Sequence, residues 1–158
     1  MGVLSLANLK LIFLGTSASI PTISRGLSSV ALLRDGELFL FDAGEGVQRS
    51  FSKAKIGFNR KMKIFISHLH GDHCVGLLGL LQTMSMLKRD KPLTVYGPQG
   101  LLGFLRNNIR SLKFGLTFTL EVKIVREGVV VESGDYVIKA CIGKHGMKNF
   151  VYSLEEKD

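Results

Sequence analysis

The sequence predicts one α/β (α+β layered) domain, in which helices pack against a β-sheet. Short apolar runs of strand length alternate with segments of helical apolar spacing along the whole chain. Two turns that contain Asp and Gly separate pairs of apolar runs, a pattern typical of hairpins. The chain has 158 residues, of which 46% are apolar, and this is enough to bury the core of one domain.

The first elements are predicted from apolar runs and from the segments rich in Ser, Thr and Gly that separate them. Residues 9–14 are mostly apolar and predict a buried strand. Residues 15–29 are rich in Ser, Thr and Gly and predict a loop. The runs 30–33 and 38–41 flank Asp-Gly, so they predict an antiparallel hairpin. The second run ends at a glycine-rich turn over 42–46.

The middle of the chain alternates helices with strands. A helix is predicted over 47–54 and a strand over 62–67. Leucine and methionine then recur at helical spacing over 77–87, which indicates a helix packed against the sheet. A short strand at 93–96 and an apolar helical pattern over 101–109 follow.

The last third predicts mainly strands. Residues 118–124 alternate apolar and polar side chains, as a half-buried strand does. Residues 129–131 and 136–142 predict a second antiparallel hairpin, and 150–154 begin one more strand. His145 lies in the glycine-containing loop between these last two strands.

Three of the four histidines gather directly after the strand at 62–67. In an extended segment, residues two apart point the same way, so His68 and His70 are expected to aim at one point. A turn at Gly71 would bring Asp72 and His73 to the same place. Imidazole and carboxylate groups are ligands for Zn²⁺, and this density favours a metal site over a histidine-rich surface turn.

A catalytic zinc site commonly has three protein ligands, and His68, His70 and His145 would form such a set. By itself His145 is typical of a solvated loop residue, but the cluster upstream needs a further ligand. Asp72 and His73 would then begin a second metal site, and Asp72 could also accept a proton from the attacking water.

The charge distribution indicates a polyanionic partner. The net charge is +8, and no acidic residue lies between Glu45 and Asp72. That interval carries the candidate RNA-binding residues Arg49, Lys53, Lys55, Arg60, Lys61 and Lys63. Basic clusters attract nucleic acid. A solvated basic face is the alternative on charge alone.

Composition also bears on the compartment. No apolar run approaches the ~20 residues that span a bilayer, and Lys10 interrupts the apolar N-terminal stretch, so no secretory signal is expected. Two cysteines make no disulfide framework. We therefore expect a cytoplasmic protein with no membrane association.

Residues 68–73, His-Leu-His-Gly-Asp-His, resemble the HxHxDH signature of the metallo-β-lactamase superfamily. The surroundings resemble one family within it, the tRNA 3′-processing endonucleases called ribonuclease Z. The similar segments are 13–17, Pro21-Thr22, Arg25, the DxGEGxQ segment within 41–49, 76–81 and 95–98. The HxHxDH pattern alone specifies only the superfamily. Together with GEGxQ it specifies a much smaller group of proteins.

The resemblance implies a four-layer αββα sandwich that binds two zinc ions. One ion would be held by His68, His70 and His145, and the other by Asp72 and His73. Asp72 would act as general base for water that attacks the phosphodiester at the 3′ side of precursor tRNA. The basic interval would help to bind the tRNA, and such enzymes act as homodimers.

Asp42 has two interpretations. The resemblance implies that it steadies the histidine loop from behind the ligands. The alternative is a turn-forming aspartate that follows a strand.

The resemblance also implies that residues 1–158 are one domain truncated at its C-terminus. The chain carries about the first half of the family's fold. The bridging aspartate, the final histidine ligand and a further catalytic histidine lie downstream in the family. We therefore expect an incomplete second zinc site, an exposed apolar sheet face, and little or no activity for this chain alone.

Two other functions stay open. One is another hydrolase of the superfamily, such as a phosphodiesterase or thioesterase acting on a small molecule. The other is a metal-binding or RNA-binding fragment without turnover. The basic clusters and the GEGxQ segment favour the endoribonuclease.

Overall fold

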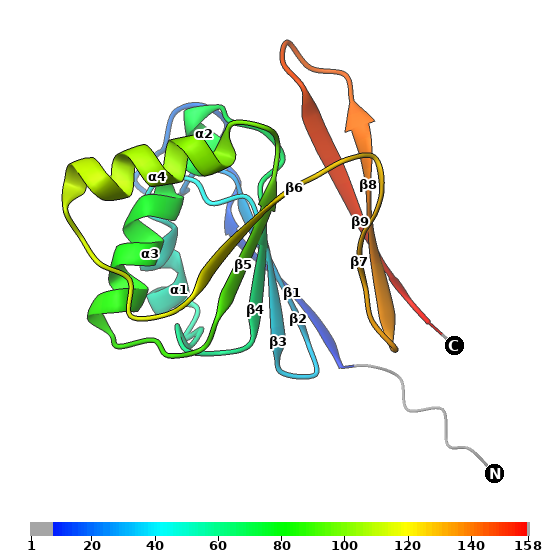
Figure 1. Ribbon diagram of the computed structural model, residues 1–158, viewed down its shortest axis with the longest axis horizontal. Coiled ribbons are helices and arrows are strands. Elements are labelled where there is room, and N and C mark those ends of the chain that lie inside the picture. Colours follow the sequence, from blue (N-terminus) through cyan, green and yellow to red (C-terminus); the bar gives the residue numbers. More distant parts are fainter. Residues whose placement is uncertain (1–7, 158) are drawn as a thin grey trace.

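The computed structural model describes residues 8–157, which form three layers (Figure 1). Helices cover one face of a six-stranded sheet, and a three-stranded sheet lies against its other face. The predicted α/β class is confirmed. None of the helices in this described range has the length and apolar character needed to cross a lipid bilayer.

The first sheet has the strand order β1-β2-β3-β4-β5-β6. Its strands are β1 (Leu9–Gly15), β2 (Ser29–Arg34), β3 (Glu37–Phe41), β4 (Met62–Phe65), β5 (Leu93–Gly97) and β6 (Leu120–Ile124). β2 pairs antiparallel with β1 and with β3, whereas β3 to β6 pair in parallel. All strands except β2 therefore run the same way, and their carboxyl ends share one edge of the sheet.

The β2–β3 hairpin turns at Asp35 and Gly36, which both have positive φ. Asp-Gly tolerates this conformation in a two-residue turn, so the predicted hairpin is confirmed.

Four helices accompany this sheet: α1 (Val47–Lys53), α2 (Gly71–Cys74), α3 (Gly76–Met86) and α4 (Leu101–Leu112). On α3 the side chains of Leu77, Leu80, Leu81 and Met84 are fully buried, in agreement with the helical spacing of the sequence. They pack in one apolar cluster with residues of β3 to β5 and of α4. This cluster supports the strands whose carboxyl ends carry the histidines.

The second sheet has the order β7-β8-β9, with β7 at Gly128–Glu132, β8 at Tyr136–Gly143 and β9 at Asn149–Glu156. It packs on the first sheet through a mainly aromatic cluster. The rings of Phe65 and Tyr96 stack at 4.9 Å, and those of Phe39 and Tyr136 meet edge-on at 5.1 Å. Such pairs add about 0.5–1.5 kcal/mol each beyond the area that they bury.

A polar cluster ties the two sheets at the opposite edge, where β3 and β4 begin. The carboxylate of Glu37 is 8% exposed and accepts hydrogen bonds from Lys63 and from Tyr136. Nζ of Lys61 lies 3.0 Å from Oε2, the oxygen that also accepts from Tyr136. Burial alone would raise the pKa of Glu37, but the two lysines hold this pKa below its usual value.

β1 differs from the prediction of a buried strand. Leu9, Leu11 and Phe13 are 48%, 55% and 66% exposed. β1 is the edge of the first sheet, and the apolar cluster between the sheets includes residues of β2 to β5 but none of β1. One face of β1 therefore packs on the helical layer and the other faces outward.

The outward face of the second sheet also carries apolar side chains. Val129 of β7 and Val151 of β9 are more than half exposed, and Cys141 of β8 is exposed. In the described part of the chain no helix covers this face (Figure 1).

Candidate metal centre

The turn that carries the histidines leaves the carboxyl end of β4, near the middle of the first sheet. Ser67 to His70 follow the strand, and α2 begins at Gly71. His70 has an extended backbone at φ −65 and ψ 143. The short helix brings Asp72 and His73 back towards His68, as expected of a turn at Gly71.

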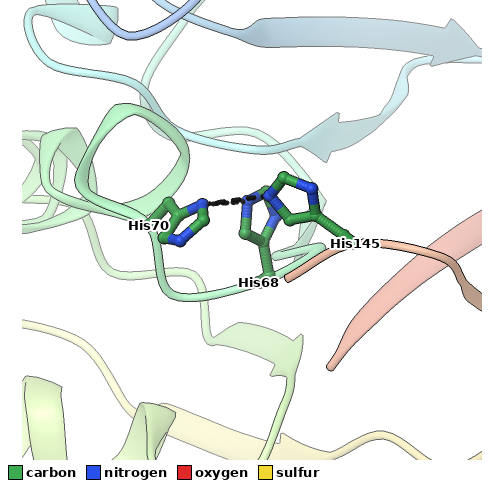
Figure 2. Close-up of side chains that lie close together, drawn as sticks. All are labelled: His68, His70 and His145. Atoms are coloured by element: carbon green, nitrogen blue, oxygen red, sulfur yellow. Dashed lines mark hydrogen bonds between the residues drawn. The ribbon is translucent and has the colours of Figure 1, made fainter. Parts of the chain in front are cut away.

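Three imidazoles converge at this point (Figure 2). Nε2 of His68 lies 3.0 Å from Nδ1 of His70, and Nε2 of His145 lies 3.1 Å from the same atom. The candidate ligand atoms of the three residues all lie within 4.8 Å of one another. His145 comes from the β8–β9 loop of the second sheet, so the cluster joins both sheets. Its nitrogen donors fit a zinc ion.

Asp72 and His73 lie beside this cluster. Oδ2 of Asp72 is 3.5 Å from Nε2 of His73, and the rings of His68 and His73 are 4.1 Å apart. Burial would raise the pKa of Asp72, but the backbone N–H of Ser19, which donates to Oδ2 at 3.0 Å, and the nearby His73 lower it. Asp72 therefore carries a negative charge at neutral pH.

Asp42 contacts the histidine turn through both of its carboxylate oxygens. Its Oδ1 accepts the backbone N–H of Ser67 at 2.8 Å, and its Oδ2 lies 2.6 Å from Nδ1 of His73. This contact raises the pKa of His73, which burial would lower. Asp42 has a positive φ of 58°, unusual for a residue other than glycine. Strain of this kind persists where the surrounding contacts require it.

The hydroxyl of Ser67 is part of the site, although the sequence pattern did not point to it. Oγ lies 2.9 Å from Oδ2 of Asp42 and 2.8 Å from Nδ1 of His68. If His68 donates from Nδ1 to Ser67 and Ser67 donates to Asp42, then Nε2 of His68 keeps its lone pair for a cation. Burial lowers the pKa of His68 and favours this neutral form. The available signal was a hydroxyl residue directly before the first histidine.

Two glycines let these segments approach one another. A Cβ on Gly44 would lie 2.5 Å from Cβ of Leu27 and 2.8 Å from the backbone oxygen of Asp72. A Cβ on Gly76 would lie 1.8 Å from the backbone oxygen of Gly44. The backbone N–H of Ala43 donates to the oxygen of His73 at 2.8 Å across this contact.

The candidate RNA-binding residues do not form one surface at the histidines. Arg49 and Lys53 are exposed on α1, which begins near the site, and Lys55 is exposed just after this helix. Arg60, Lys61 and Lys63 precede or begin β4, at the edge of the sheet opposite the histidines.

Lys63 differs from the exposed basic residues of this interval. Its ammonium group is paired with Glu37, and its side chain is only 20% exposed. Lys61 is also paired with Glu37, although its side chain is 72% exposed.

Comparison with known proteins identifies the family. Residues 9–155 match the family model described as "Anti-Pycsar protein Apyc1". Ribonuclease Z from Nitrosopumilus maritimus is 49% identical over 150 residues, which cover 95% of this chain and 50% of that protein. The chain spans about half the length of the curated relatives it matches.

Solved structures agree with the fold. The short form of human tRNase Z has a TM-score of 0.86 and 34% identity, over 92% of this chain and 64% of that one. A metallo-β-lactamase fold protein from Bacillus subtilis has a TM-score of 0.73 at 16% identity, over 93% of this chain and 58% of that one. The predicted resemblance to ribonuclease Z is confirmed. The chain therefore has the metallo-β-lactamase fold, belongs to the family that the Apyc1 model describes, and matches about half of ribonuclease Z.

Proposed function

We propose that this chain forms the zinc-binding half of an endoribonuclease that removes 3′ trailers from precursor tRNA. The observation that carries the proposal is the convergence of His68, His70 and His145 on one point at the carboxyl edge of the sheet. The 49% identity to a protein named ribonuclease Z supports the substrate class.

The donor set fits two neighbouring zinc ions to different extents. His68, His70 and His145 would hold one ion with three nitrogens, as catalytic zinc sites commonly do. Asp72 and His73 would contribute two ligands to a second. Zinc bound at such a site acts as a Lewis acid and lowers the pKa of water to ~7.

The remaining roles belong to the chain itself. Asp72 is ionised, close to the histidines and held by the backbone N–H of Ser19, so it can accept a proton from the attacking water. Asp42 and Ser67 keep the imidazoles of His68 and His73 in fixed orientations. The second zinc site needs further ligands, so we propose that turnover requires protein beyond residues 1–158. We propose that residues 1–158 are one domain truncated at its C-terminus.

We further propose that the complete enzyme is a cytoplasmic homodimer. The compartment rests on the two free cysteines, which suit a reducing environment. The dimer rests on the family resemblance. The exposed apolar side chains of β1 and of the second sheet give this chain alone a tendency to associate.

Elemental analysis combined with cleavage assays tests the proposal. The purified chain should bind one zinc ion per chain tightly, should lose it on His145→Ala, and should cleave precursor tRNA poorly or not at all. Absence of stoichiometric zinc would refute the metal centre.

The two alternatives give different results in the same assays. Hydrolysis of a small phosphodiester or a thioester, with no effect on precursor tRNA, would instead support a small-molecule hydrolase. Zinc binding without turnover, even when the remainder of the protein is supplied, would support a metal-binding or RNA-binding fragment.

A further inference from the structure

Two basic hollows lie on either side of the histidine turn. The first, of about 380 Å³, is lined by Thr16, Ser24, Arg25, Ser50 and Lys53 together with apolar residues and glycines, and we call it the β1 hollow. The second, of about 540 Å³, is lined by Gln99, Ile124, Val125, Arg126 and Lys148, and we call it the β6 hollow. Each hollow has two cationic side chains and no acidic one in its lining.

The four cations are available to a ligand. Arg25, Lys53, Arg126 and Lys148 are all exposed, and none of them takes part in an ion pair within residues 8–157. Glu127, next to Arg126 in the chain, accepts the backbone N–H of Ile142. Arginine and lysine are the usual side chains for binding phosphate.

The order of the strands places the hollows on opposite sides of the metal centre. The β1 hollow lies at the carboxyl end of β1, and the β6 hollow at the carboxyl ends of β5 and β6. The histidine turn follows β4, between them on the same edge. At a strand spacing of about 4.8 Å, β4 lies about 14 Å from β1 and about 10 Å from β6.

One loop connects the β1 hollow to Asp72. The loop between β1 and β2 contributes Arg25 to the hollow and the N–H of Ser19 to Asp72. Arg25 itself is held in a turn, because its N–H donates to Oγ1 of Thr22 and its oxygen accepts the N–H of Thr22.

The β6 hollow is joined to the histidines as closely. Lys148 follows His145 by three residues in the β8–β9 loop. The next strand is attached to the histidine turn by the N–H of Phe150, which donates to the oxygen of Ser67 at 2.9 Å.

We propose that the two hollows bind phosphates of one RNA strand on either side of the phosphodiester that is cleaved. The inference rests on the RNA substrate proposed above and adds where its backbone lies. The hollows are about 24 Å apart if five strand spacings separate them. A mononucleotide therefore occupies at most one of them, whereas a longer strand occupies both.

Salt-dependent binding of oligouridylate, measured by fluorescence anisotropy without zinc, tests this proposal. The variants are Arg25→Gln/Lys53→Gln and Arg126→Gln/Lys148→Gln. The matched control is Lys88→Gln/Lys91→Gln, a pair of exposed lysines just before the amino end of β5, at the far edge of the sheet. Circular dichroism checks that each variant is folded.

We expect each hollow variant to weaken binding of a twelve-nucleotide strand about tenfold at 0.1 M salt. The slope of log K against log salt should fall by about 0.7 for each phosphate that the variant no longer neutralises. The control should match the parent. A dinucleotide should respond to one hollow at most.

Equal slopes for the hollow variants and the control, or no binding of the twelve-nucleotide strand by the parent at low salt, would overturn the proposal. Because no cleavage is measured, the result is independent of turnover. Loss of binding in the hollow variants, together with failure to process precursor tRNA even when the remainder of the protein is supplied, would leave the phosphate-binding hollows standing and refute the proposed reaction.

Discussion

Ser67→Ala should weaken zinc binding although Ser67 is not itself a ligand. The substitution removes a hydroxyl that lies 2.8 Å from Nδ1 of His68 and 2.9 Å from Oδ2 of Asp42. The backbone N–H of Ser67 still donates to Asp42, so the turn itself should be preserved. Loss of a group that orients a ligand typically lowers metal affinity 10–100-fold, or about 1.4–2.7 kcal/mol.

Competition with a chromophoric chelator at constant pH measures this affinity directly. Ser52→Ala is the matched control, because the Ser52 hydroxyl contacts only the backbone oxygen of Gln48 in α1. Ser67→Thr keeps the hydroxyl and should recover most of the affinity. An unchanged zinc affinity in Ser67→Ala, or an equal loss in Ser67→Thr, would refute the role of the hydroxyl.

Three further experiments test the fold. Glu37→Gln should lower the free energy of unfolding at pH 7 by about 2–3 kcal/mol. The pKa of Glu37 is lowered in the folded state, so its contribution to stability is lost as the carboxylate becomes protonated. Urea titrations should therefore show that the difference in the free energy of unfolding between the parent and Glu37→Gln shrinks below pH ~4. A difference that stays constant with pH would contradict this. Gly44→Ala should lower the free energy of unfolding by about 2 kcal/mol or more in the same titration. Its control, Gly103→Ala at an open helical position, should raise the free energy of unfolding by about 0.5–1 kcal/mol. Equal effects of the two substitutions would argue against crowding at Gly44. Iodoacetamide should label the exposed Cys141 well before Cys74, whose pKa burial raises to about 11, and mass spectrometry would detect the opposite order if this is wrong.

Local patterns in the sequence predicted the strands and the longer helices, whereas the short helix α2 was expected only as a turn. The hairpin at Asp35-Gly36 and the buried stripe of α3 depend on residues close in the chain, and both are found. The exposure of β1 could not be predicted in this way, because it depends on where the second sheet ends.

The site shows the same division between near and distant contacts. The approach of His68 and His70 follows from their spacing along an extended segment. The partners of Ser67 and Lys63 could not be predicted, because Asp42 and Glu37 precede them by 25 and 26 residues. Lys63 is therefore paired with Glu37, although it lies in a basic interval of the sequence.

The origin of His145 has a consequence for stability. His68 and His70 follow a strand of the first sheet, whereas His145 lies on a loop of the second. An ion held by all three would add a link between layers that are also joined by aromatic packing, the Glu37 cluster, the Arg34–Glu156 ion pair and the hydrogen bond from Phe150 to Ser67. Ligand that binds only the closed arrangement adds about 2.7 kcal/mol at 100 times its dissociation constant. Chelation would then first loosen the smaller sheet, and amide exchange in β8 and β9 would quicken before exchange in β3 and β4.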